Sequence, residues 1–275
     1  MFRNILIPLE DANHQIPAVE KAMELQEASG TTLHLVKGIR NWFSLDSLWK
    51  TRKTEAAELK MLRNQVIENI PAIHTASAVL IKRTAFTNLK KYFSSHKIDL
   101  VITDHNSNVQ NNTRPGYQLP EILSRQIPAP VLTILHHHPS SLNKSVLVPI
   151  THFIPEKKVE MLLEIAQRFH SRIHIVTMLD KTRSDSKQRS DAFYQAYKQL
   201  SESGHTPEYK ILLGHQSNES FFTYARQIKA GMILSNLSRE PGITTEWFRA
   251  RITNIFHPLP ATYILTVATG LPSHA

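Results

Sequence analysis

The chain has 275 residues, of which 41% are hydrophobic, 20% are charged and none is cysteine, so disordered chains, disulfide scaffolds and thiolate metal sites are excluded. The net charge of +9 divides evenly, with 16 Lys and Arg against 12 Asp and Glu in residues 1–140 and 16 against 11 in residues 141–275, which disfavours a nucleic-acid-binding stripe. No apolar run approaches the ~20 residues that cross a bilayer, and the opening MFRNILIPLEDANHQ lacks the apolar stretch of a secretory signal, so we expect a cytoplasmic protein.

Short β-branched apolar runs alternate with helical patterns through the first half of the chain. Each run is typical of a buried strand, and each helical pattern places its apolar residues on one stripe. The predicted elements are a strand over 5–9, a helix over 17–29, a strand over 33–37, a helix over 55–70, a strand over 76–81, a helix over 87–95, a strand over 100–103, a helix over 119–126 and a strand over 131–135.

The second half repeats this alternation. Its predicted elements are a strand over 146–150, a helix over 156–169, a strand over 173–177, a helix over 187–203, a strand over 209–213, a helix over 220–228, a strand over 232–234, a helix over 245–255 and a strand over 263–266. Strands that alternate with helices predict right-handed crossovers and a parallel sheet covered on both faces.

Four sequence blocks occur twice in the same order. The strand Asn4 to Leu9 recurs as Ser145 to Ile150, and the last of the four, from Ile127 to Ile134, recurs from His257 to Ile264. This indicates a tandem duplication. We expect an α/β protein of two doubly wound, five-stranded parallel-sheet domains over 1–137 and 145–269, joined by a polar linker over 138–144.

These blocks resemble the universal stress protein family. The likeness rests on Asn4 to Glu10, on Leu33 to Val36, on Asp99 to Ile102 and on Ile127 to Leu132, and it returns in the second half, where Gly214 also matches. The resemblance implies a nucleotide-binding-like fold, a role in the stress response without defined catalysis, and pairing of two domains through their final strands. In a tandem member this pairing would make an internal pseudo-dimer.

Members of that family that bind ATP resemble one another in a Gly-x2-Gly-x9-Gly-Ser/Thr stretch after the fourth strand and an Asp after the first. Glycine at such positions lets backbone N–H groups approach phosphates closely. The first domain lacks this pattern, because Asp104 stands where the first glycine is expected and Glu10 and Asp11 follow the first strand. Carboxylates would repel a triphosphate. We therefore expect no ATP in the first domain.

The second domain has a composition at the corresponding positions that is more compatible with anion binding. The signature glycines are absent again, but Thr151 replaces the Asp after the first strand, and hydroxyl, amide and guanidinium groups follow the fourth. Such groups could bind a phosphate, a nucleotide or another small anion. The predicted ligand-binding residues are Thr151, Gly214, Ser235, Asn236, Ser238, Arg239, Thr244 and Thr245. The plainer alternative is that these residues are structural, with one threonine capping a helix.

Other residue groups favour structural roles. Glu10, Asp104 and His105 could bind a cation, but a polar loop is the simpler interpretation, and we expect no metal. His34 and His174 occupy equivalent strand positions, which favours a shared packing role. The apolar segment from Trp42 to Trp49 is either a lid over the first sheet or an exposed surface for a partner.

The sequence thus favours a non-catalytic, cytoplasmic stress-response protein with no required cofactor and a degenerate nucleotide site. A nucleotide in the second domain, a homodimer and a further protein partner stay open. The competing hypotheses are an ATP- or ADP-binding switch or slow ATPase, and a protein that associates weakly with nucleic acid through its basic surface.

Overall fold

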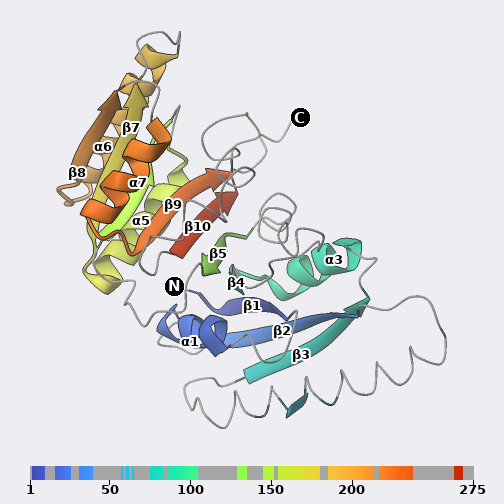
Figure 1. The fold of residues 1–275 in the computed structure, drawn as a ribbon. Helices are drawn as coiled ribbons and strands as arrows, with labels where there is room; N and C mark the ends of the chain where they lie inside the picture. Colours follow the sequence, from blue (N-terminus) through green and yellow to red (C-terminus); the bar gives the residue numbers. More distant parts are fainter. Residues whose placement is uncertain are drawn as a thin grey trace. The chain divides into compact units, whose positions relative to one another are not determined.

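The structure is a computed structural model, shown in Figure 1. It describes residues 2–9, 16–25, 31–39, 57, 60, 61, 64, 75–82, 86–104, 129–134, 145–151, 154–179, 185–213, 217–237 and 263–268. The chain divides into two compact units, Met1–Ile134 and Leu135–Ala275. Each unit is an α/β domain.

Unit 1 contains five parallel strands in the order β3-β2-β1-β4-β5. Two of its helices have described bounds, and the described residues 57, 60, 61 and 64 are helical within the predicted helix 55–70. The elements are β1 (Asn4–Leu9), α1 (Ile16–Leu25), β2 (Thr32–Ile39), β3 (Thr75–Lys82), α3 (Phe86–His96), β4 (Leu100–Asp104) and β5 (Val131–Ile134).

Unit 2 repeats this topology with five parallel strands in the order β10-β9-β6-β7-β8. Its elements are β6 (Ser145–Pro149), α5 (Glu156–Phe169), β7 (Arg172–Leu179), α6 (Ser186–Glu202), β8 (Glu208–Leu213), α7 (Ser217–Gln227), β9 (Met232–Leu237) and β10 (Tyr263–Ala268). In both units the first strand lies between the second and the fourth, so the winding of the sheet reverses beside it.

The predicted fold class is confirmed, because all ten predicted strands are present and both sheets are parallel and doubly wound. The predicted helices 119–126 and 245–255, the linker 138–144 and the segment from Trp42 to Trp49 lie outside the described residues. The exact domain boundaries and the pairing of the two domains as a pseudo-dimer stay predictions. Among the described helices, none is both long and apolar enough to cross a membrane.

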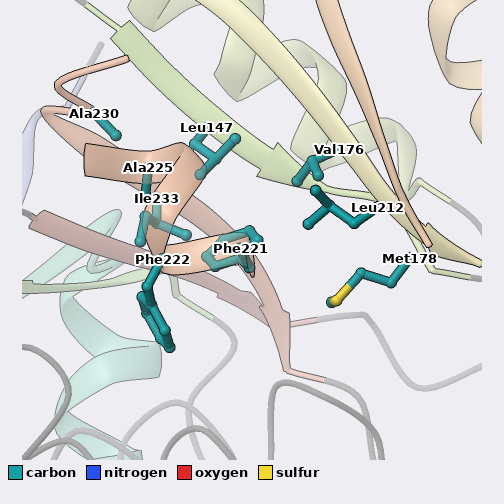
Figure 2. Close-up of a cluster of buried hydrophobic side chains, with 9 residues drawn as sticks. All are labelled: Leu147, Val176, Met178, Leu212, Phe221, Phe222, Ala225, Ala230 and Ile233. Carbon is teal, nitrogen blue, oxygen red and sulfur yellow. The ribbon is translucent and has the colours of Figure 1, made fainter. Parts of the chain in front are cut away.

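The hydrophobic cores repeat as well. In unit 2, α7 packs Phe221, Phe222 and Ala225 against the sheet, as Figure 2 shows. Buried residues at equivalent positions in unit 1 form a matching cluster: Leu6 for Leu147, Val36 for Val176, Phe93 for Ala225, Ile98 for Ala230 and Val101 for Ile233. The turn after the helix is also shared, since Lys97 and Lys229 both adopt a positive φ, of 48° and 50°.

Candidate functional site

The carboxyl ends of β6, β7 and β9 in unit 2 form the edge where a doubly wound sheet binds ligands. The chain leaving β6 is fixed to β7 at this edge. The Ile150 backbone N–H donates to the Val176 carbonyl over 2.8 Å, and the Thr177 hydroxyl donates to the Ile150 carbonyl over 3.0 Å. Thr151, the next residue, is half-buried. The position of its backbone is therefore set by the neighbouring strand.

Lys158 brings a buried amine to the same edge. It lies in the first turn of α5, its side chain is fully buried, and its Nζ donates to the carbonyl of Pro149, the last residue of β6, over 3.3 Å. A lysine ammonium has three N–H donors. In the described part of the chain, the Pro149 carbonyl is the hydrogen-bond acceptor at this amine.

The fold does not require a lysine at this position. In α5 the residues at 158, 159, 161, 162 and 165 are buried, and in α1 the residues 140 positions earlier, at 18, 19, 21, 22 and 25, are buried too. This pattern makes Ala18, which is 1% exposed, the unit 1 equivalent of Lys158. Unit 2 therefore carries a buried cation where its sister domain carries a methyl group.

Among the described residues no acidic side chain pairs with Lys158, whereas the two other buried Lys or Arg side chains of these residues each contact a carboxylate. Arg189 contacts the Asp185 carboxylate with Nε and Nη2, each at 2.8 Å, and Lys21 contacts Glu24 at 2.6 Å. Burial without a carboxylate penalises the charged form, and it lowers the pKa of the Lys158 amine to about 7. An anion that entered this edge would supply the missing charge.

Lys158 was predicted from the sequence only as part of the helix over 156–169, with no role in a site. Helical periodicity carried the signal. Lys158 precedes Met161 by three residues, Leu162 by four and Ile165 by seven, which places it on the apolar stripe of α5.

The predicted ligand-binding residues fall into two groups. Thr151 follows β6, while Ser235 and Asn236 are consecutive residues of β9, the strand beside β6. Strands β6 and β9 pair at Val146–Met232 and Leu147–Ile233, so Ser235 lies further along β9, towards its carboxyl end. The side chain of Ser235 is buried, so it belongs to the interior of this edge. Gly214, Ser238, Arg239, Thr244 and Thr245 lie outside the described residues.

The corresponding edge of unit 1 is less completely described. Asp104 is the last residue of β4, whereas Glu10, Asp11 and His105 lie outside the described residues. Within the described ranges, no three His, Asp or Glu side chains are grouped as metal ligands would be. The alternative cation site at Glu10, Asp104 and His105 therefore stays untested.

Both units contain a buried histidine bound to a helix tyrosine. His34 of β2 lies 2.8 Å from the Tyr92 hydroxyl, and His174 of β7 lies 3.2 Å from the Tyr224 hydroxyl. Both histidines are 3% exposed, and burial lowers the pKa of each, to about 4 for His34. The shared packing role predicted for His34 and His174 is confirmed. Each anchors the helix that precedes β4 or β9 to the sheet.

The fold resembles solved universal stress protein structures. The chain superposes on a universal stress protein from Archaeoglobus fulgidus with a TM-score of 0.65 at 12% identity, covering 97% of this chain and 96% of that one. A putative universal stress protein from Pseudomonas aeruginosa UCBPP-PA14 gives 0.63 at 14% identity, with coverages of 97% and 93%. The fold that the sequence resemblance implied is therefore confirmed.

A different kind of protein shares this fold. The cytoplasmic domain of a prokaryotic cation chloride cotransporter matches with a TM-score of 0.58 at 11% identity, over 97% of this chain and 96% of that one. No protein-family model matches the chain, and no curated protein matches its sequence. The comparisons thus give the architecture of the chain and not its chemistry.

Proposed function

We propose that this chain is a non-catalytic stress-response protein whose second unit binds a small phosphate-bearing anion at the carboxyl edge of its sheet. The stress-response role rests on the likeness to universal stress protein structures. The anion site rests on one observation: the buried Lys158 amine lies at the end of β6, beside the reversal of winding, and its partner in the described part of the chain is a carbonyl rather than a carboxylate.

An anion would satisfy three features of this edge at once. It would accept the remaining N–H donors of Lys158, it would lie near the amino-terminal end of α5, where the helix dipole is positive, and Thr151 would offer a hydroxyl from the adjoining chain. Hydrogen bonds from a charged donor to a phosphate oxygen are about twice as strong as neutral ones. The low polarity around Lys158 strengthens the attraction further.

Unit 1 lacks the corresponding cation, since Ala18 occupies the position of Lys158. Its fourth strand also ends in Asp104, an acidic residue, where unit 2 has Asn236. Both differences lower the affinity of that edge for phosphate groups. We therefore propose that ATP does not bind unit 1 and that the two halves of the duplication have diverged in their ligand chemistry.

The proposal is tested by thermal unfolding with inorganic phosphate, AMP and ATP. A ligand at ten times its Kd stabilises the folded state by about 1.4 kcal/mol, so a millimolar site gives a measurable rise in Tm. We expect phosphate to stabilise the wild type and to lose this effect in Lys158→Ala, which installs the unit 1 residue. The matched control is Lys21→Met, which installs the unit 2 residue Met161 in unit 1 and should leave phosphate binding intact.

Three results would contradict the proposal. The first is that no phosphate-bearing compound raises the Tm of the protein. The second is that phosphate raises the Tm of Lys158→Ala as much as that of the wild type. The third is that the wild type hydrolyses ATP and Lys158→Ala does so more slowly. Turnover of ATP would support the slow ATPase instead. The stress role is tested separately, by comparing the abundance of the protein before and after starvation or oxidative stress.

A further inference from the structure

One edge of unit 2 exposes an apolar strand. Strand β8 is the last in the order β10-β9-β6-β7-β8, and among the described strands it pairs with β7 alone (Figure 1). Tyr209, Ile211 and Leu213 are 60%, 42% and 70% exposed. Side chains two apart share one face of a strand, so these three form a continuous apolar row.

Helix α6 extends this row. Phe193 and Tyr197 contact the Tyr209 ring edge to face, with centroids 6.2 Å and 5.8 Å away, so the row faces the α6 side of the sheet. Tyr194, also on α6, is 68% exposed. We call Tyr194, Tyr209, Ile211 and Leu213 the β8 edge patch. Leu212 points to the opposite face and joins the core beneath α7 (Figure 2).

The charges of this edge strand lie off the patch. Natural edge strands are commonly blunted by charges, prolines or bulges, because an open strand recruits another strand. The charged residues of β8, Glu208 and Lys210, alternate with the patch and therefore belong to the other face. The described residues hold just one exposed large hydrophobic side chain outside the patch, Met61.

We propose that two copies of this chain associate through their β8 strands, paired antiparallel about a two-fold axis at Ile211. In that register Ile211 meets Ile211 of the second copy, and Tyr209 meets Leu213 of the second copy at both ends. The row is then self-complementary, as a two-fold interface requires. Cross-strand pairs of aromatic and branched side chains stabilise such a ladder.

The charged residues select this register over its neighbours. A shift that puts Lys210 on the two-fold axis would set two lysines directly opposite each other, which destabilises a strand pair. It would also leave Leu213 opposite Pro207, which has no N–H for the ladder. A shift the other way, with Leu212 on the axis, would leave Tyr209 without an apolar partner.

The exposed area of the patch sets the size of the contact. Side chains of this size and exposure offer on the order of 500 Å² per copy, so two copies would bury at most about 1,000 Å², the lower limit for a specific interface. Hydrogen bonds along the paired strands would add to this. We therefore expect a dimer that dissociates on dilution.

Sedimentation tests the proposal directly. The wild type should be dimeric at micromolar concentration or above, and Ile211→Lys should be monomeric, because it places two ammonium groups together on the axis. The control Met61→Lys makes the same change at an exposed position outside the patch and should stay dimeric. A monomeric wild type, or a dimer that Ile211→Lys does not weaken, overturns the proposal. Unchanged circular dichroism shows that each variant folds.

Crosslinking tests the register, because the chain has no cysteine of its own. In Ile211→Cys the two new thiols would lie opposite each other, within the Cα separation of about 4.4–6.8 Å that a disulfide spans. We expect oxidation to link this variant into a covalent dimer. Lys210→Cys, whose thiol would face Leu212 of the second copy, should link poorly. The reverse order would overturn the proposed register.

Discussion

Replacing Lys158 with methionine should change how the stability of unit 2 depends on pH. Burial lowers the pKa of the Lys158 amine from 10.5 to about 7 in the folded protein. An unfolded lysine keeps its ordinary pKa, so between these values the unfolded state binds more protons and stability rises with pH. The free-energy penalty for burying the charged amine is greatest below pH 7. The difference between the two pKa values limits this penalty to about 5 kcal/mol.

Urea unfolding of wild type and Lys158→Met between about pH 6 and pH 10 measures this effect. We expect the variant to be more stable than the wild type at the acid end, by several kcal/mol, since methionine fills the site without a charge. The advantage should shrink as the pH rises from about 7 towards 10.5, because over this range the buried amine is neutral while the unfolded lysine is still charged. A difference between the two proteins that does not vary with pH would refute the reasoning, because it would mean that Lys158 keeps an ordinary pKa.

The remaining predictions concern the packing of both units. His34→Gln should flatten the loss of stability that the wild type shows as pH falls from 6.5 towards 4, because burial and the nearby His96 lower the pKa of His34 to about 4. The free energies of unfolding of the two proteins, measured with denaturant, should change relative to each other by up to about 3 kcal/mol over this range, and parallel pH curves would contradict this. Tyr224→Phe removes the hydroxyl 3.2 Å from His174 and should cost about 1 kcal/mol by urea unfolding, whereas no loss would show that this bond adds nothing. Phe221→Ala deletes a fully buried ring beneath α7 and should destabilise unit 2 by about 3–5 kcal/mol; a loss below 1 kcal/mol in calorimetry would contradict the described core.

Much of the fold could be predicted from the sequence because each element occurs in both halves of the duplication, so its pattern can be compared between two copies. A run such as Val146 to Ile150 is apolar at nearly every position, which is typical of a strand buried on both faces. The ends of some elements differ from the predicted ones. The strand predicted over 33–37 extends to Ile39 because β3 pairs with it along its whole length, and such pairing is not encoded in β2 itself.

The candidate site was predicted only in part. The reversal of winding follows from strand order, so the edge that holds Thr151 and Ser235 could be located. The buried amine of Lys158 could not be recognised by residue type, because lysine is rarely buried and a helix start is usually solvated. The exposure of Tyr209 and Leu213 depends on which strand lies at the edge of the sheet. The sequence does not show this, because an apolar run has the same pattern in an edge strand as in a central strand.

The most direct test of the anion site is the pKa of Lys158 itself, measured by NMR on protein with labelled lysine side chains. The resonance is assigned as the one that Lys158→Met lacks. We expect a pKa near 7 without phosphate, as burial sets it, and a higher value in saturating phosphate, because the bound anion stabilises the ammonium. A pKa of ordinary size, or one that phosphate leaves unchanged, would contradict the proposal that this amine binds an anion.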